Sequence, residues 1–179
     1  MPEIKKILDI GCGKKKILGA VGIDFSDNEN VDVVHDLNVF PYPFEDSEFD
    51  EVHIIDTLFL LSDPVRVMEE IWRVSKPAGK VVVVQPYFRS VWNFVDPWVK
   101  NFGTVHSFAF YDPDDPICQR YEYSSARFKT EKIVFNEGVP MRWFTRLVAA
   151  FANKYPRKYE LYLSQYYPLG MIAYKLKKL

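Results

Sequence analysis

The sequence contains few cysteines, with only Cys12 and Cys118 among its 179 residues. These two lie far apart in the chain and match no spacing of metal ligands, so nothing in the sequence predicts a metal site. Unpaired thiols are typical of a reducing compartment, which favours a cytoplasmic protein. We therefore expect neither a disulfide framework nor a structural metal centre.

Long apolar runs are also missing, because no stretch of the sequence approaches the length of a membrane span. The first expected strand begins almost at Met1, which leaves no room for a signal peptide. Both observations agree with a cytoplasmic location. The sequence therefore predicts no membrane partner.

An excess of either charge is absent as well. The chain has 23 basic and 24 acidic residues, which gives a formal net charge of -1. This balance argues against a protein whose main partner is a nucleic-acid backbone or an anionic membrane, and it favours a small molecule as substrate. A local basic patch stays compatible with these totals, and neither the identity of the substrate nor the oligomeric state follows from them.

A glycine turn directly after a short apolar run is the first positive signal. Residues 7–10 (Ile-Leu-Asp-Ile) predict a buried parallel strand, and Gly11 and Gly13 follow it one residue apart. Glycine suits this place because a side chain would clash with a closely bound ligand or forbid a positive φ. A cofactor loop and a plain connection between a strand and a helix both give this pattern.

Short apolar strands that end in acidic residues fill the first half of the chain. We expect strands at residues 4–10, 20–24, 31–35, 51–55 and 81–84. Asp24, Asp36 and Asp56 stand at or just after the ends of three of them, where the ligands of doubly wound sheets lie. Only about one helical turn fits between the first two strands, so we expect a shortened first crossover.

Helical signals between these strands complete the expected fold. An amphipathic helix is expected after Asp63 and Pro64, and residues 76–80 are expected to turn the chain into the fifth strand. This order of elements predicts an α/β fold with an open, mostly parallel sheet and helices on both faces. The length predicts one domain over residues 1–179.

The second half of the chain is aromatic and less periodic. Between residues 86 and 123, aromatic residues alternate with turn-forming Asp-Pro pairs, which excludes one long helix. Such a segment is typical of a lid or a substrate loop, although an aromatic mini-core beneath a surface loop gives the same pattern. We expect the chain to end with a strand at 128–135, helices at 141–153 and 157–166, an antiparallel strand at 170–176, and a solvated tail of lysines at 175, 177 and 178.

Five motifs stand in a fixed order along residues 7–85. They are residues 9–13 (Asp-Ile-Gly-Cys-Gly), Asp24, residues 36–37 (Asp-Leu), residues 49–52 (Phe-Asp-Glu-Val) and residues 76–80 (Lys-Pro-Ala-Gly-Lys). In this order they resemble the motifs of class I, Rossmann-like S-adenosylmethionine-dependent methyltransferases. Further similarity, at residues 33–37, 41–44 and 96–97, is to small uncharacterised methyltransferase-like proteins of bacteria and archaea. The resemblance implies S-adenosylmethionine as the cofactor.

The resemblance also implies how the first strands hold the cofactor. It assigns the turn of Gly11, Cys12 and Gly13 to the methionine part of S-adenosylmethionine, with Asp9 orienting that turn. Asp24 would hold the ribose hydroxyls. Cys12 fits the turn as a small side chain, and we do not expect it to act as a nucleophile.

The same resemblance assigns the adenine and the sulfonium to later residues. Phe25 would flank the adenine, Asp36 would accept a hydrogen bond from its amino group, and Leu37 would lie on the ring face. Ile55 and Asp56 would border the sulfonium and the incoming nucleophile. A pocket lined by carboxylates suits a cofactor that carries positive charge.

Methyl transfer depends mainly on alignment, so a general base is optional. If a base acts, Asp56 is the best placed candidate and His106 is the second. Lys14, Lys15 and Lys16 occupy the place of a third glycine that is common in the family. They could contact the cofactor carboxylate or an anionic substrate, or form a solvated run of charge.

Two departures from the small relatives leave the activity open. The relatives tend to carry His-x-x-Glu-His where residues 56–60 read Asp-Thr-Leu-Phe-Leu, and Asp-Pro-Thr-His where residues 96–99 read Asp-Pro-Trp-Val. Our first hypothesis is an active methyltransferase with an unidentified, more apolar substrate, and the alternative is a catalytically silent methyltransferase-like binding or partner subunit. A nicotinamide-dependent oxidoreductase is disfavoured, because its third glycine is missing and Asp24 follows the turn too soon.

Overall fold

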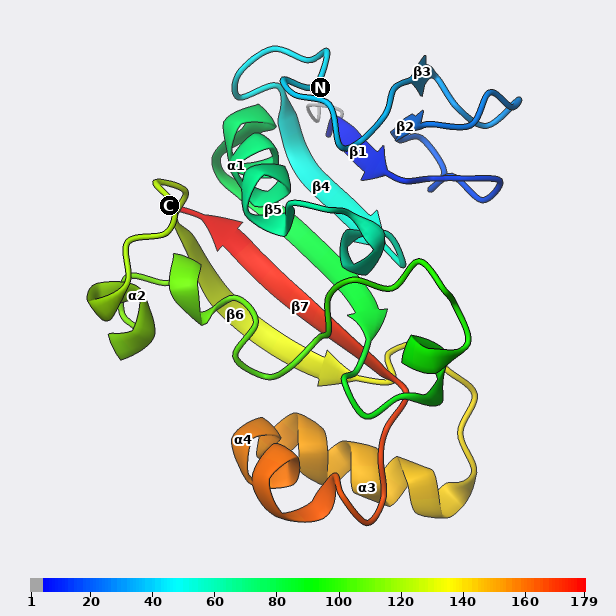
Figure 1. Cartoon of the computed structure of the whole chain (residues 1–179), viewed down its shortest axis with the longest axis vertical. Coiled ribbons are helices and arrows are strands. Elements are labelled where there is room, and N and C mark those ends of the chain that lie inside the picture. The colour runs from blue at the N-terminus through cyan, green and yellow to red at the C-terminus, as the bar shows by residue number, and fades with distance from the viewer. Residues whose placement is uncertain (1–4) are drawn as a thin grey trace.

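The computed structural model describes residues 5–179, and these form one seven-stranded sheet (Figure 1). Its strands are β1 (Ile7–Ile10), β2 (Val21–Asp24), β3 (Val33–Val34), β4 (Phe49–Ile55), β5 (Ser75–Pro86), β6 (Phe128–Phe135) and β7 (Met171–Lys178). Their order in space is β3-β2-β1-β4-β5-β7-β6. Strands β1 to β5 are parallel, and β7 is antiparallel to both of its neighbours. The predicted mostly parallel sheet with an antiparallel last strand is confirmed.

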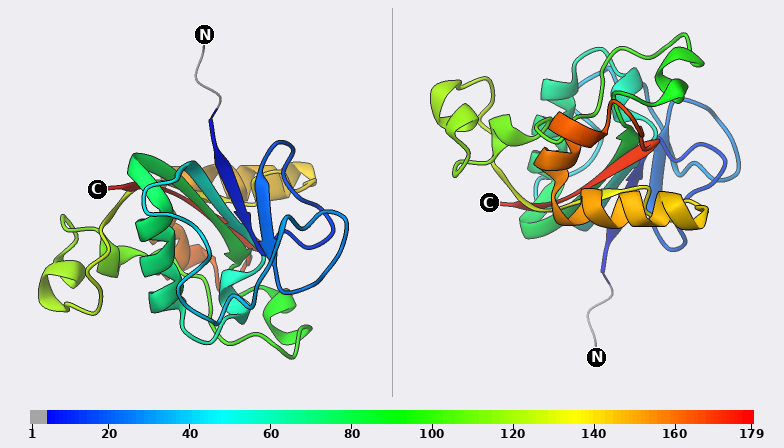
Figure 2. Two further views of the ribbon diagram at one scale, coloured as in Figure 1. Left: turned by 90° about the horizontal axis from the view of Figure 1, so that it is seen from above. Right: turned by 90° about the horizontal axis from the view of Figure 1, so that it is seen from below.

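Helices cover both faces of this sheet. The helices are α1 (Pro64–Val74), α2 (Pro116–Arg120), α3 (Trp143–Lys154) and α4 (Pro156–Lys158), and single turns form η1 (Leu58–Leu60), η2 (Val91–Phe94), η3 (Ala109–Tyr111) and the π-helical η4 (Tyr159–Leu163). Figure 2 shows α1 and α3 on opposite sides of the strands. None of the helices within residues 5–179 is long and apolar enough to cross a bilayer.

Helix α1 forms where its sequence signals predict. The Asp63 side chain accepts a hydrogen bond from the Arg66 backbone N–H at 3.0 Å, and Pro64 occupies the first turn, where no backbone donor is needed. One apolar stripe of the helix is buried against the sheet, and its members are Val67, Met68, Ile71 and Val74. Burial of this stripe fixes the connection between β4 and β5 on one face of the sheet.

The first crossover is short, as predicted. Residues 11–20, all of which are described, contain no helix and connect β1 to β2 through turns. Side chains hold this loop in place: Asp9 accepts from the Ile17 backbone N–H at 2.8 Å, and the Lys16 ammonium pairs with Asp32 at 2.6 Å. Lys16 is therefore occupied by a structural ion pair, while Lys14 and Lys15 are exposed.

Residues 76–80 do not form the predicted turn. Strand β5 already begins at Ser75, which pairs with Phe49 of β4, and the regular pairing resumes with Lys80 opposite Glu51. Ala78 adopts a positive φ of 61° between these two points, which absorbs the extra residues of the bulge. The Pro-Ala-Gly signal therefore marks a bulge inside a long strand.

Other element boundaries also differ from the sequence expectations. The third strand is shorter than residues 31–35, because β3 is an edge strand that pairs only with β2. The helix expected over residues 157–166 is divided into α4 and η4. Of the first expected strand, residue 4 lies outside the described residues.

The predicted solvated tail of lysines is wrong. These residues belong to β7, and Lys178 is only 6% exposed. Its ammonium donates to the Ser75 carbonyl oxygen at 2.8 Å and lies 4.1 Å from the centre of the Trp72 ring. Burial lowers the pKa of Lys178 below its usual value. The last strand thus joins the second half of the chain to the first.

Sheet topology determines where a ligand can bind. After the edge strand β3 the chain returns across β1 and β2 to form β4 on the other side of β1. The direction of strand order therefore reverses between β1 and β4. In open α/β sheets, ligands bind at such a reversal, outside the carboxyl ends of the strands.

Candidate functional site

A cavity of about 630 Å³ lies at this reversal, and we name it the switch-point cavity. Its lining comes from the turns that follow β1, β2, β3 and β4 and from the segment after β5. The lining residues are Gly11, Asp24, Phe25, Asp36, Leu37, Asn38, Thr57, Leu60, Leu61, Asp96 and Trp98. Three carboxylates and two exposed aromatic rings thus surround a volume typical of small-ligand sites, which span about 300–1,000 Å³.

The glycine turn forms one wall of this cavity. Gly11 has a φ of +72°, and its N–H donates to the Ile23 carbonyl oxygen at 2.8 Å, which closes the turn onto β2. A Cβ atom at Gly11 would lie 2.2 Å from Oγ1 of Thr57. Glycine is therefore required here both for its backbone conformation and for the close approach of the chain after β4.

Asp24 is held rigidly beside this turn. Its Oδ2 accepts from the Gly13 N–H at 3.0 Å, and its Oδ1 accepts from the Ser26 N–H at 2.9 Å and the Ser26 hydroxyl at 2.6 Å. A carboxylate offers about four lone-pair positions, so these three donors leave about one for a ligand. The Asp24 side chain can therefore accept one further hydrogen bond, from a hydroxyl group of a ligand, without any rearrangement.

Exposed rings and a second carboxylate form another part of the lining of the switch-point cavity. Phe25 is 75% exposed and Trp98 is 71% exposed, although both line the same cavity. Asp36 accepts hydrogen bonds from the backbone and side-chain nitrogens of Asn38, which lower its pKa. Phe25 and Trp98 offer ring faces, and Asp36 offers an ionised acceptor. This combination suits a nitrogen-containing aromatic ring.

A smaller cavity of about 250 Å³ adjoins the first at the ends of β4 and β5, and we name it the β4–β5 cavity. Its lining residues are Asp56, Phe59, Pro86, Trp92, Val95, Asp96 and Met171. Asp96 lines both cavities, and Asp56 directly precedes Thr57 of the switch-point cavity. The two cavities therefore share Asp96 in their linings and lie next to the same turn after β4.

Asp56 has an unusual backbone and an unusual environment. Its φ is +50°, and its N–H donates to the Val84 carbonyl oxygen at 2.9 Å, which holds the turn against β5. Asp56 is exposed at the surface, but nearby protein groups remove part of the water around its carboxyl group, which raises the pKa of Asp56 above the usual value. A raised pKa brings a carboxyl group closer to the range in which it can exchange protons during a reaction.

The remaining predicted residues lie outside both cavities. Asp9 is buried and supports the loop through Ile17, as described above. Cys12 is also buried, and burial raises the pKa of its thiol to about 11, which makes it a poor nucleophile. The Gly13 N–H donates to Asp24, and Gly13 does not line the switch-point cavity. Ile55 is the last residue of β4. His106 lines a separate cavity of about 410 Å³ with Asp112 and Arg157.

Several lining residues were not predicted. Thr57 and Asn38 each stand one residue after a predicted site residue. A prediction that included one more residue after each of these site residues would have found them. Asp96 and Trp98 belong to a motif that resembles the small relatives at residues 96–97 and departs from them at residues 98–99, and neither residue was assigned to the cofactor site. Their position depends on contacts of the next residues, because the N–H groups of Lys100 and Asn101 donate to the Phe59 carbonyl oxygen at 2.9 and 3.1 Å.

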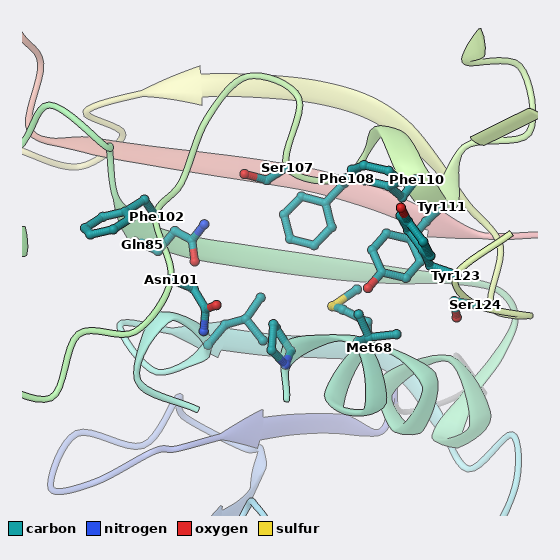
Figure 3. Close-up of a pocket in the computed structure, with 13 residues that line it drawn as sticks. Met68, Gln85, Asn101, Phe102, Ser107, Phe108, Phe110, Tyr111, Tyr123 and Ser124 are labelled. Atoms are coloured by element: carbon teal, nitrogen blue, oxygen red, sulfur yellow. The ribbon is translucent and has the colours of Figure 1, made fainter. Parts of the chain in front are cut away.

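The aromatic-rich segment over residues 86–123 also contributes to a fourth cavity, which we name the aromatic cavity. It measures about 310 Å³ and lies over β5 beside α1 (Figure 3). Figure 3 shows the amide groups of Gln85 and Asn101 at one end and the rings of Phe108 and Tyr111 nearer to Met68 of α1. The residues after 101 therefore surround a space separate from the switch-point cavity, whereas Asp96 and Trp98 reach that cavity.

Comparison with known proteins agrees with this architecture. Residues 8–83 match the profile of a family described as "Methyltransferase domain". A demethylmenaquinone methyltransferase of Staphylococcus saprophyticus is 28% identical, over 81% of this chain and 76% of that protein. A second protein of the same name, from Bacillus mycoides, is 32% identical, but the match covers only 45% of this chain and 44% of that protein.

Solved structures match almost the whole chain. A SAM-dependent methyltransferase from Archaeoglobus fulgidus superposes with a TM-score of 0.57 at 18% identity, over 98% of this chain and 87% of that one. An S-adenosylmethionine-dependent methyltransferase from Mesorhizobium loti gives a TM-score of 0.57 at 14% identity, over 99% and 93%. Residues 8–83 therefore carry a methyltransferase domain, and the described chain has the Rossmann-like fold of the S-adenosylmethionine-dependent enzymes.

Proposed function

We propose that this methyltransferase holds S-adenosylmethionine in the switch-point cavity and methylates a planar, apolar acceptor held in the β4–β5 cavity. The observation that carries the proposal is the junction of the two cavities at Asp96. A cofactor and an acceptor in adjoining spaces can meet with their reacting atoms aligned, which is the main requirement of methyl transfer.

The lining of the switch-point cavity suits this cofactor. The Asp24 carboxylate has one acceptor position left for a ribose hydroxyl, and Phe25, Trp98 and Asp36 offer ring faces and an acceptor to the adenine. When bound, S-adenosylmethionine supplies a methyl group on a positively charged sulfur, which keeps the bonding electron pair as the methyl group leaves. The carboxylates that line the cavity complement that positive charge.

The lining of the β4–β5 cavity supports an apolar acceptor. Phe59, Trp92 and Val95 contribute apolar surface, and Pro86 and Met171 extend it. The curated relatives are named for demethylmenaquinone, a quinone, and we extend only this chemical class to the present chain. The acceptor would lie on rings and aliphatic groups, with Asp56 and Asp96 as its polar contacts.

Asp56 is the residue that we assign to proton transfer. It lines the β4–β5 cavity, and its raised pKa reflects a carboxyl group that is partly removed from water. The ionised carboxyl group would take the proton that the acceptor loses as its nucleophilic atom gains the methyl group. His106, the other candidate base, lines the cavity beside Asp112 and Arg157 and has no part in this proposal.

Calorimetric titration tests the placement of the cofactor. We expect the purified protein to bind S-adenosylmethionine and S-adenosylhomocysteine with micromolar affinity and not to bind NAD. Asp24→Ala should weaken both interactions about tenfold or more, because the lost carboxylate also releases Gly13 and Ser26. Asp27→Ala is the matched control, since this exposed acid lies three residues away and is absent from the cavity lining. Equal affinities in the two variants would contradict the proposed placement.

A labelling experiment separates an active enzyme from the silent alternative. The protein is incubated with methyl-labelled S-adenosylmethionine and a panel of planar acceptors that carry an ionisable hydroxyl group or a reduced quinone ring. We expect label in at least one acceptor. Cofactor binding without any labelled acceptor would favour the silent binding subunit, for which the apolar residues after Asp56 are the motivating observation.

A further inference from the structure

The outer face of α3 is apolar, although it is exposed to solvent. Trp143 is 74% exposed and Leu147 is 60% exposed, and Phe151 and Tyr155 follow at the same four-residue spacing, each 40% exposed. We name these four residues the α3 stripe. The opposite face of the helix is the one that is buried, through Val148, Ala149 and Ala152. The helix therefore has a second apolar face with no partner among the described residues.

The charge around the α3 stripe has one sign. Residues 138–159 contain five basic and no acidic residues, whereas the whole chain has a net charge of -1. The basic residues are Arg142, Arg146, Lys154, Arg157 and Lys158, and all five are exposed. The net charge of the whole chain does not reveal this local excess of positive charge.

Among the described residues, nearby acidic groups form an ion pair with only one of these five basic residues, Arg157. Glu137 pairs with Lys175 at 2.6 Å, and Glu160 accepts from the Val105 N–H at 2.8 Å. Nη2 of Arg157 forms an ion pair with Oδ2 of Asp115 at 3.4 Å. The ammonium groups of Lys154 and Lys158 each lie 5.3 Å from the centre of the Tyr155 ring. Positive charge and an aromatic side chain thus occupy the same surface.

Position in the fold leaves the α3 stripe free to meet a flat partner. Helix α3 packs on the edge strand β6, where the Phe135 N–H donates to Asn153 at 2.6 Å. Figure 1 shows α3 and α4 together at one end of the molecule, away from β2 and β3, which lie beside the switch-point cavity. Within the 12 residues of α3, Trp143 and Phe151 are about 12 Å apart along the helix axis, and Tyr155 follows directly after the helix.

We propose that the α3 stripe docks this protein onto an anionic lipid bilayer. Trp143, Leu147 and Phe151 would enter the boundary between headgroups and acyl chains, while the basic residues on either side contact anionic headgroups. Charge complementarity favours this occupant, because a helix with an aromatic apolar face and flanking lysines and arginines is typical of interfacial membrane binding. The inference is independent of the proposed acceptor, since none of these residues lines the switch-point or β4–β5 cavity.

Vesicle sedimentation with the full chain tests the electrostatic part. We expect the protein to bind phosphatidylcholine vesicles that contain about a third phosphatidylserine, and to bind neutral vesicles much more weakly. Arg142→Ala with Arg146→Ala should reduce the affinity about 25-fold, at about fivefold for each basic residue near the surface. Lys14→Ala with Lys15→Ala is the matched control, because both lysines are exposed in the loop between β1 and β2. The affinity for anionic vesicles should also fall with added salt.

A second pair of variants tests the apolar part. Leu147→Ser should weaken binding to the same vesicles several-fold, and Leu18→Ser, at a leucine that is 98% exposed in the first loop, should leave it unchanged. Unaltered melting curves would show that both variants are folded. Equal binding to anionic and neutral vesicles, no binding to either, or equal losses in the stripe and control variants would overturn the proposal. Capture of a protein partner without lipid binding would overturn it as well.

Discussion

The two halves of the molecule hold their ligand-facing residues in different ways. In the half built from β1 to β4, these residues stand at strand ends or within a few residues of them, as Gly11, Asp24 and Thr57 do. In the other half they come from the segment after β5, which is held by contacts such as that of the Asn101 side chain with the Leu61 carbonyl oxygen at 2.9 Å. Substitutions in the first half should therefore affect ligand binding and stability together, and those in the second half should affect binding alone.

Gly11→Ala should have the largest effect and would test the first half of this comparison. Its Cβ would lie 2.2 Å from Thr57 Oγ1 at a φ of +72°. Overpacking and a left-handed backbone together predict a loss of cofactor affinity of about 100-fold and lower thermal stability. Calorimetry and melting curves measure the two effects.

Gly19→Ala is the matched control for that substitution. Gly19 has a φ of +78°, but no atom lies within 4 Å of its added Cβ. It should lose some stability through backbone strain and keep its affinity for S-adenosylmethionine. If both variants lost cofactor affinity equally, close approach of the chain at Gly11 would not explain the requirement for glycine.

Asp56→Asn should lower turnover by about 100-fold while cofactor affinity stays unchanged. The wild-type rate should rise with pH through a pKa above the usual 3.8 of aspartate, because partial desolvation of the carboxyl group raises this pKa and only the ionised carboxyl group can take a proton. The variant should lack this rise. Single-turnover rates across pH provide the measurement, and unchanged turnover would remove Asp56 as the base.

Trp98→Ala and Trp92→Ala sharpen the comparison within the second half. Trp98 lines the switch-point cavity, so its removal should weaken cofactor binding about tenfold through lost ring contacts. Trp92 lines the β4–β5 cavity, so its removal should raise the KM for the acceptor and spare the cofactor. Neither change should lower the melting temperature appreciably, since both side chains are exposed. Identical effects of the two variants on cofactor binding would contradict two separate spaces.

Lys178→Met should have the smallest effect, at the contact between the two halves. A methionine keeps the apolar stem over Trp72 and removes a buried charge, so we expect a change in unfolding free energy below about 1 kcal/mol at neutral pH. The pKa of Lys178 is lower in the folded state, so the unfolded state binds this proton more tightly. Wild-type stability relative to the variant should therefore rise as the pH increases through that lowered pKa towards 10.5.

Chemical denaturation at several pH values provides this measurement. The difference between the two proteins is the relevant quantity, because other groups titrate in both. A difference that stays constant with pH would mean that the Lys178 ammonium is solvated in the native state, in contrast to its position against the Ser75 carbonyl oxygen.

Much of the first half could be predicted from the sequence because its signals are local. A strand, its terminal acid and the following glycine are adjacent in the chain, so Gly11, Asp24 and Asp36 were identified without tertiary information. The strand starts were harder, since Ser75 enters β5 through pairing with Phe49 rather than through its own propensity. The interpretation of residues 76–80 as a turn was wrong for that reason.

The second half resisted prediction because its positions depend on distant partners. Nothing near Trp98 in the sequence indicates that it lines the same cavity as Phe25, since this follows from backbone contacts with Phe59. Lys178 resembled a solvated terminal lysine for the same reason, as its partners lie about a hundred residues earlier in the chain. The lid role predicted for residues 86–123 stays a prediction, supported by Asp96 and Trp98 alone.

If the cofactor and the acceptor occupy the two cavities as proposed, Asp96 connects their binding thermodynamically. One carboxylate lines both spaces, and the Trp98 N–H donates to its Oδ1 at 2.8 Å, so a ligand that moves this side chain in one cavity alters the other. Linkage then requires the effect to be reciprocal: cofactor changes the affinity for acceptor by the same factor as acceptor changes the affinity for cofactor. The total free energy of binding both ligands is therefore the same whichever ligand binds first.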